Sequence, residues 1–456
     1  MSNTVSITDG STTVQLNDGL TAWTTELPMR AADMTRQVMA ATGDGVALAP
    51  SAYRDVTETI RLLVLGATAD AARQNVQVIE RVLDRARQVG NGWGRTRCFL
   101  QVQLAGEATV WRCEILAARL SYENPAELWR RQARVEVIIT RRHYWEGPET
   151  ALAMTSAVNT APTTDPVTWH NGADNVTGER NWVSIAAAQV VGTLPSPLRL
   201  RLQLAAVNSF TLGSFWIGNY TWFAPATVDP IFTGSQSDEG TGAVAWSGSS
   251  EYIAKNWTLS EAQMQAANGQ YVRPLLAFSD KPSTTTALRA ALRLGAGAPG
   301  GVDIFNTDPF FAQADPWGAS SVQDFGPIAL PPGGFVAPAG ATRLRIYATK
   351  SGGDVFTVHS AHLFPAGDGV FRRIRAAGGA TWVFSNGNGI IDDGIESRIH
   401  SFDVLGTNPF LAGHFTPVHV WPNRTNLLRM INGSVTWAAG EPWTAQAWYR
   451  PRRHTV

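Results

Sequence analysis

Cysteine is nearly absent from this chain of 456 residues, which contains only Cys98 and Cys113. A fold held together by several disulfides is therefore excluded. A chain of this length has room for two to four domains of about 100–200 residues, each with its own core. In a reducing compartment we expect both cysteines to be small buried apolar residues, although they could also lie close across a hairpin.

An excess of charge of either sign is also missing. The 37 Lys and Arg residues balance the 37 Asp and Glu residues, so nothing in the composition indicates a nucleic-acid binder or a membrane-surface protein. Charged residues make up 16% of the chain, below the usual ~25%. Tryptophan is abundant, at 17 residues. Uncharged polar and aromatic surface must therefore be plentiful, which is typical of surfaces that partner subunits cover.

Long apolar runs are absent as well. No segment approaches 18 consecutive apolar residues, and the first residues, MSNTVSITDG, lack a basic segment followed by an apolar one. We therefore expect no signal peptide and no membrane insertion. The sequence indicates a protein that is made and kept in a cytoplasm.

Motifs for cofactors and metals are weak. Residues 295–300 match the spacing of a dinucleotide-binding loop, but Pro299 does not open a helix that could hold a pyrophosphate. His359 and His362 fall in a predicted strand and point to opposite faces, and His414 and His419 share that problem. We expect no cofactor and no metal site from these residues.

Carboxylates suited to catalysis or calcium binding are also poorly placed. The loop 386–394, with Glu396 nearby, is rich in oxygen ligands but lacks the regular spacing of a calcium loop, so a turn is favoured and calcium stays open. The pairs Asp238–Glu239 and Asp392–Asp393 lie in predicted loops. Nothing in the sequence places two of these carboxylates on opposite sides of a glycosidic bond, as glycoside hydrolysis requires. We therefore expect a protein that is not an enzyme.

Hydrophobic periodicity predicts one helix and several strands in residues 1–149. Apolar residues recur at spacings of three and four from Asp70 to Val89, which predicts an amphipathic helix capped near Thr68. Alternation predicts strands at 5–16, 20–27, 53–65, 97–104, 109–119 and 131–142. The first two are expected to pair through the turn Asn17–Gly19. One helix on an antiparallel sheet is an α+β unit with open sheet edges, which are often used to build oligomers.

The chain beyond residue 149 is expected to be almost entirely β. An exposed connection rich in Ala, Thr and Pro spans 150–166, and short strands separated by Gly, Pro and Ser clusters follow it. This pattern predicts a β-sandwich or jelly roll. The fold class is therefore mainly β with one α+β domain.

One aromatic cluster in this β region could bind a sugar. Flat apolar rings suit pyranose faces and a neighbouring amide suits hydroxyl groups. The candidate glycan platform is Trp216, Asn219, Tyr220 and Trp222. Burial of the same cluster in a core or a subunit interface is the more common outcome.

Several segments together resemble one known family. The N-terminal stretches are the TDG start, TETIRLLVLG, NVQVIERVLDRA and ITRRHYWEGPE. They are similar to the belt domain of distal tail and minor tail proteins of tailed bacteriophages. The segment VVGTLPSPLRLRLQ resembles the proline-containing entry to the C-terminal half of those proteins, and residues from Ser397 through HVWPNRTNLLRMI to AWYRPRR resemble its closing strands.

The resemblance implies a domain plan and a structural role in the virion. It implies a belt-like antiparallel sheet or barrel at 1–149, a β-sandwich at 150–203 plus 368–456, and an inserted unit at 204–367 that resembles carbohydrate-binding jelly rolls. It further implies a homo-oligomeric ring, commonly a hexamer, at the tail tip or baseplate. Such a ring joins the tail tube protein to the tail-tip or hub proteins, lets DNA pass through its channel, and is assembled in the cytoplasm of the host bacterium.

The resemblance also suggests which residues contact neighbouring subunits. The candidate assembly interface is Arg141, Arg142, Tyr144, Trp145, Tyr449, Arg450 and Arg452. The alternative function is a carbohydrate-binding adhesin, in which the inserted unit contacts host surface glycans.

Overall fold

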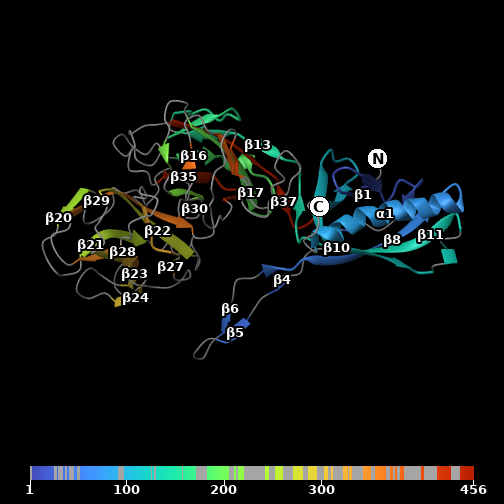
Figure 1. Cartoon of the computed structure of the whole chain (residues 1–456), viewed down its shortest axis with the longest axis horizontal. Helices are drawn as coiled ribbons and strands as arrows, with labels where there is room; N and C mark the ends of the chain where they lie inside the picture. Colours follow the sequence, from blue (N-terminus) through green and yellow to red (C-terminus); the bar gives the residue numbers. More distant parts are fainter. Residues whose placement is uncertain are drawn as a thin grey trace.

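The protein is mainly β, with one α+β unit at its N-terminal end, as the sequence predicts (Figure 1). The computed structural model describes residues 3–24, 28, 34–35, 38–40, 46–48, 52–90, 97–124, 126–127, 130–156, 158–170, 182–204, 210–211, 214–219, 242–245, 252–259, 271–280, 286–294, 302–306, 310–311, 322–326, 328–330, 342–350, 355–365, 370–372, 375–376, 381–384, 402–404, 418–432 and 442–456. No helix within these ranges is both long and apolar enough to cross a membrane.

The N-terminal unit is a nine-stranded antiparallel sheet. Its main strand order is β2-β1-β9-β10-β11-β8-β3, and β12 joins β10 to β37. The strands are β1 (Thr4–Thr8), β2 (Thr13–Gln15), β3 (Ala22–Trp23), β8 (Val56–Leu65), β9 (Cys98–Gln103), β10 (Val110–Tyr122), β11 (Gln132–Arg141), β12 (Trp145–Glu146) and β37 (Arg452–Arg453). Because β37 comes from the other end of the sequence, both ends of the chain contribute to this sheet.

Helix α1 (Ala69–Gly90) lies along one face of the sheet and builds its core. Thr68 caps the helix, since its Oγ1 accepts from the Ala71 N–H at 3.1 Å. The apolar stripe that the sequence predicts, including Val76, Ile79 and Leu83, is buried against the strands. Each such side chain contributes about 1.5–3 kcal/mol when it is fully buried. Cys98 and Cys113 are buried free thiols in the same core, as expected.

The first strands pair differently from the sequence prediction. Residues 5–16 form a hairpin of their own, because Asp9 Oδ1 accepts from the Ser11 and Thr12 N–H groups and turns the chain. The predicted turn at Asn17–Gly19 exists, but β3 after it pairs with β8 instead of β2. The local turn signal was correct and the partner strand was wrong.

A narrow arm and two further β units complete the fold. In Figure 1 the arm extends away from the N-terminal sheet; it contains β4 (Met34–Thr35), β5 (Val38–Ala40), β6 (Val46–Leu48) and β7 (Ala52–Tyr53). The second unit has a seven-stranded sheet of β13 (Thr150–Leu152), β15 (Val167–His170), β17 (Ser196–Leu204), β32 (Thr381–Phe384), β33 (Phe402–Val404), β34 (His419–Val420) and β36 (Pro442–Tyr449). Its remaining elements are β14 (Met154–Ser156), β16 (Trp182–Ile185), β19 (Ser214–Asn219), β30 (Val370–Arg372) and β35 (Asn426–Asn432) in a five-stranded sheet, the pair β18 (Phe210–Thr211) and β31 (Arg375–Ala376), and the 3-10 helix η3 (Ala187–Gln189).

The described strands between residues 242 and 365 pair only with one another. They form one sheet of β20 (Gly242–Ala245), β22 (Tyr271–Asp280), β26 (Val322–Asp324), β27 (Ile328–Ala329) and β29 (Val355–Pro365), and a second of β21 (Tyr252–Leu259), β23 (Thr286–Leu294), β24 (Val302–Asn306), β25 (Phe310–Phe311) and β28 (Thr342–Lys350). These strands lie inside the insertion predicted at 204–367, whereas β18 and β19 pair with strands of the second unit. The domain limits and the jelly-roll topology stay predictions.

Candidate functional site

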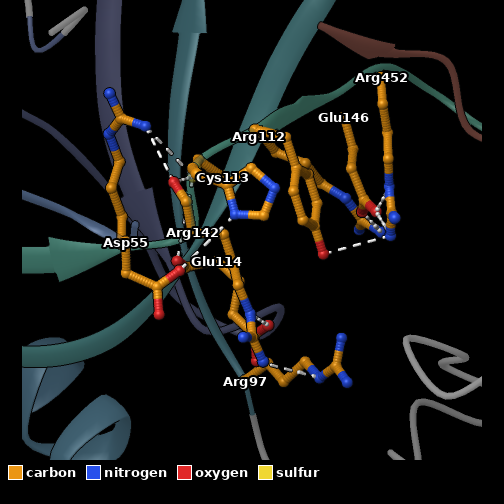
Figure 2. Close-up of polar contacts among 11 residues, drawn as sticks. Asp55, Arg97, Arg112, Cys113, Glu114, Arg142, Glu146 and Arg452 are labelled. Carbon is orange, nitrogen blue, oxygen red and sulfur yellow. Dashed lines mark hydrogen bonds and ion pairs between the residues drawn. The ribbon is translucent and has the colours of Figure 1, made fainter. Parts of the chain in front are cut away.

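The N-terminal and second units meet at a junction built around the corner between β11 and β12. Strand β11 ends at Arg141, the chain turns through residues 142–144, and β12 then pairs with β37. The N–H of Gly147 donates to the carbonyl of Pro451 at 2.8 Å and continues this pairing. Figure 2 shows that charged side chains from several strands converge here.

Glu146 is the most densely paired acid of the junction. It is buried, and its carboxylate accepts from Arg452 Nε at 3.0 Å and Nη2 at 2.7 Å, as Figure 2 shows. Arg112 Nη2 lies 3.7 Å from the second oxygen. Desolvation raises the pKa of this carboxyl, but Arg452 and Arg112 outweigh it, so the pKa is lowered overall. Glu146 is therefore ionised and couples β37 to the N-terminal sheet.

A second buried pair joins β11 to β8. Arg141 is 0% exposed, and its Nε donates to Glu58 Oε1 at 3.2 Å. Its guanidinium also lies over the Trp145 ring at 4.8 Å and donates to the Arg142 carbonyl at 3.0 Å. Both charges would be costly to bury alone, so each depends on the other.

The third acid, Glu114, pairs with two arginines that flank the neighbouring strands, Arg97 just before β9 and Arg142 just after β11. Its carboxylate lies 3.2 Å from Arg142 Nε and 3.4 Å from Arg97 Nε. Removing one partner from a buried pair typically costs about 3–5 kcal/mol, because it leaves an uncompensated charge. The three glutamates therefore make the junction sensitive to single substitutions.

The second unit is held to the junction by the end of β36 and by a loop at residues 189–194. The Tyr449 hydroxyl donates to the Gln189 carbonyl at 3.0 Å and accepts from the Val191 N–H at 2.8 Å. Gly192 has a φ of +123°, and a Cβ there would lie 2.6 Å from the Arg452 carbonyl oxygen. Only glycine fits this close approach without strain.

The structure places all seven predicted interface residues at this junction. Arg141, Arg142, Tyr144 and Trp145 come from the β11–β12 corner, and Tyr449, Arg450 and Arg452 come from the opposite end of the chain. Tyr144, for example, receives the Arg452 guanidinium on its ring at 4.0 Å and on its hydroxyl at 3.2 Å. Within one chain these residues contact one another; that they also contact a second copy stays a prediction.

The three glutamates were not among the predicted interface residues, although a signal exists. Glu58 occupies an inward position between Val56 and Ile60 in an alternating strand. A charge on the buried face of a strand requires a buried partner. That rule would have indicated an arginine facing β8.

The other predicted sites lie only partly among the described residues. In the glycan platform, Asn219 is buried and its amide donates to the His419 carbonyl at 2.7 Å and to Asn426 Oδ1 at 2.8 Å. Trp216 lies in β19, and Tyr220 and Trp222 fall outside the described residues. The platform stays a prediction.

The candidate metal and catalytic residues also lie only partly among the described residues. His359 and His362 lie on β29, and His419 on β34. The loops 295–300 and 386–394, and the residues Asp238, Glu239, His414 and Glu396, fall outside the described residues. Among the side chains that the structure does describe, no group of three His, Cys, Asp or Glu could hold a metal ion.

The sheet face opposite α1 carries polar and charged side chains together with half-buried apolar ones such as Leu63 and Ile138. Thr57 and Thr59 on β8 are exposed, and the Thr57 and Thr140 hydroxyls lie 3.2 Å apart. Arg61 and Glu136 form an exposed ion pair at 3.2 Å on the same face. Along β8, the residues of this face alternate with the residues that are buried beneath α1. No described element packs over this face as α1 does over the other one.

The edge of this sheet at β8 is largely open in the described part of the chain. Strand β3 pairs with β8 only at Leu63 and Val64. The Leu65 N–H points to that edge, since it donates to the Thr21 carbonyl at 2.9 Å. By alternation the Thr59 N–H points the same way, beyond the reach of β3. Such an edge can accept a strand from another chain.

Comparisons with known proteins give only distant likenesses. No family model and no curated protein matches the sequence. The solved structures that it is similar to include the Dit protein of phage SPP1, described as a paradigm of the hub adsorption apparatus of phages that infect Gram-positive bacteria, with 8% identity and a TM-score of 0.34 over 99% of both chains.

Another is the phage P2 baseplate in its activated conformation with calcium, with 8% identity and a TM-score of 0.31 over 100% of both chains. The same baseplate with strontium has 9% identity and a TM-score of 0.26, over 81% of this chain and 98% of that one.

Proposed function

We propose that the protein is a structural component of a bacteriophage tail, in which copies assemble into a ring at the distal end or baseplate. The ring joins the tail tube to the tail tip and surrounds a channel for DNA. The observation that carries this proposal is the open strand edge at β8, next to the sheet face opposite α1, over which no described element packs. The family resemblance of the sequence supports the same role.

The open edge of β8 is the surface on which we base ring formation. A closed ring needs a heterologous contact that is repeated around one axis. The β8 edge differs from the β2 edge at the other end of the sheet, so the two could pair in successive copies. Six copies is the number that the family resemblance suggests.

The sheet face opposite α1 is suited to line a channel for DNA. A strongly basic wall would bind phosphates by releasing their counterions and would slow the DNA. This face carries threonine hydroxyls and the exposed Arg119, and two of its arginines face carboxylates, Arg61 at 3.2 Å from Glu136 and Arg134 at 4.0 Å from Glu123. The chain as a whole also has zero formal charge. DNA would therefore pass without being held.

The test is to block the β8 edge without disturbing the sheet inside one chain. Thr59→Pro removes an N–H that points away from β11, so the pairing of β8 with β11 is retained while strand addition is prevented. Thr59→Val changes the same side chain but keeps the N–H. Light scattering coupled to size exclusion, with negative-stain imaging, should show rings for the wild type and Thr59→Val. Thr59→Pro should be monomeric; rings in Thr59→Pro, or a monomeric wild type at all concentrations, would refute the proposal.

The adhesin alternative concerns the inserted unit alone. Because the described strands at 242–365 pair only with one another, this unit can be removed with little disturbance of the other sheets. Virions that carry a chain with residues 242–365 deleted, which keeps β18 and β19 in the second unit, should still form tails if the chain is structural. Normal tails that fail to adsorb to the host would assign glycan binding to the insertion.

A further inference from the structure

The strap segment, Arg450–Val456, lies between the two units and contacts both. Its strand β37 pairs with β12 of the N-terminal sheet. On the other side, the N–H groups of Thr193 and Leu194 donate to the Arg452 carbonyl at 2.9 and 3.2 Å. Detaching the strap segment would therefore break the hydrogen bonds that connect the second unit to the N-terminal sheet.

Two histidines, His454 of the strap segment and His143 of the N-terminal unit, pack around one tyrosine at the base of the arm. The ring of Tyr53, on β7, lies 4.1 Å from the His454 ring and is stacked on His143 at 5.7 Å. His143 also meets the Tyr144 ring edge-on at 4.9 Å. His454 Nδ1 is buried and has no hydrogen-bond partner within the described chain. The arrangement is an apolar stack of rings, which suits neutral imidazoles.

Charged groups act on His143, where Arg452 and Arg142 are themselves paired with Glu146 and Glu114, whereas desolvation alone acts on His454. His143 faces one acid, Asp55, whose Oδ1 lies 3.9 Å from His143 Nδ1. Arg452, His454 and Arg142 oppose the effect of Asp55 on His143. Tyr53 and Tyr144 contribute neutral rings and hydroxyl groups. Desolvation lowers the pKa of His143, and Arg452, His454 and Arg142 lower it further against the opposing effect of Asp55. Desolvation alone lowers the pKa of His454.

We propose that the strap segment is an acid-sensitive latch, in which protonation of His143 and His454 detaches it and frees the two units to reorient. Two imidazolium ions would flank Tyr53, next to the guanidinium groups of Arg142 and Arg452, with Asp55 as the nearest counter-charge. The detached strap segment separates these charges and hydrates them. The latch belongs to the isolated chain and does not depend on ring formation.

The direction of the pH effect follows from the lowered pKa values. A detached histidine binds its proton near its ordinary pKa of about 6.5, whereas the docked one binds it only at lower pH. Docking is therefore fully favoured above about pH 6.5 and weakens as the pH falls through the docked pKa. Each unit of lowering corresponds to about a tenfold change in the docking equilibrium for each histidine.

Hydrogen exchange of the amides that the strap segment protects is a direct test. The protection factors of Gly147, Thr193 and Leu194 should fall about tenfold between pH 7.5 and 5.5, after correction for intrinsic exchange rates. The helix α1 amides should keep their protection, which excludes general unfolding. The double variant His143→Phe/His454→Phe keeps the stacked rings but cannot take a charge.

The double variant separates titration of these rings from other effects of acid. We expect its protection factors at Gly147, Thr193 and Leu194 to be the same at both pH values. The proposal is overturned if the wild type keeps full protection at pH 5.5, or if the double variant loses as much as the wild type. If loss of α1 protection shows that the double variant misfolds, the single variant His454→Phe is the test. It should lose less protection at Gly147, Thr193 and Leu194 between pH 7.5 and 5.5 than the wild type does. An undiminished loss in His454→Phe would also overturn the latch.

Discussion

Replacing Glu146 by glutamine tests whether the junction depends on its buried charges. The substitution keeps the shape and one carbonyl acceptor but removes the counter-charge of Arg452, which lies 2.7 Å away, and of Arg112. Both side chains of the Glu146–Arg452 pair are about nine-tenths buried. Breaking a buried pair costs about 3–5 kcal/mol, and glutamine recovers part of this through its remaining hydrogen bonds. We expect a loss of about 3 kcal/mol in the free energy of unfolding of the N-terminal unit.

The matched control is Glu136→Gln. Glu136 also pairs with an arginine, Arg61 at 3.2 Å, but the two side chains are 37% and 71% exposed. Exposed pairs contribute about 0–1 kcal/mol, so this variant should unfold close to the wild type. Thermal unfolding followed by exchange of α1 amides should give a Tm about 6–12 °C lower for Glu146→Gln. Equal stability of the two variants would refute the assignment of Glu146.

The pH dependence of the same comparison provides a second check. The pKa of Glu146 is lowered in the folded state because its arginine partners outweigh desolvation. Its stabilising contribution is therefore present above the unfolded pKa of about 4.3 and is lost as the pH falls through the folded value. The difference between wild type and Glu146→Gln should shrink in acid. A difference that stays constant down to about pH 3 would contradict the ionised state.

Three further predictions concern positions around the junction and the core. Gly66→Ala should destabilise the N-terminal unit by about 1–3 kcal/mol in denaturant titrations, because a Cβ there overlaps backbone atoms in the first turn of α1. Tyr449→Phe should cost about 0.5–1.5 kcal/mol and speed amide exchange in the 189–191 loop, since the Gln189 carbonyl and the Val191 N–H lose their hydrogen-bond partner. Cys98 and Cys113 should resist iodoacetamide at pH 8 in the native protein and react after denaturation, because burial raises the pKa of both thiols to about 12.

Periodic patterns predicted the parts of the fold that local sequence determines. The spacing of three and four placed the helix at 70–89, and the structure has it at 69–90. Alternation placed strands at 53–65 and 131–142, which correspond to β8 and β11. The partner of β3 was missed because pairing with β8 is a long-range choice that the Asn17–Gly19 turn does not determine.

The junction could be predicted only in part for the same reason. The arginines and aromatic residues near 141–145 and 449–452 were indicated by the family resemblance of the segments that contain them. That β12 pairs with β37 could not be inferred, since about 300 residues separate them and a two-residue ladder has no periodic pattern of its own. Of the three glutamates, only Glu58 was accessible to reasoning from the sequence, through its inward position on the alternating strand β8.

The three buried glutamates of the junction differ in whether their arginine partners belong to the N-terminal unit or to β37. Glu58 and Glu114 find arginines within residues 97–142, so their pairs can form when the N-terminal unit folds alone. Glu146 has only Arg112 at 3.7 Å from that unit, and its close partner Arg452 arrives with β37. Until then a nearly buried carboxylate lacks its main counter-charge, which disfavours a closed corner. We therefore expect the β11–β12 corner to be stable only when β37 supplies Arg452, so that this part of the junction links the folding of the two units.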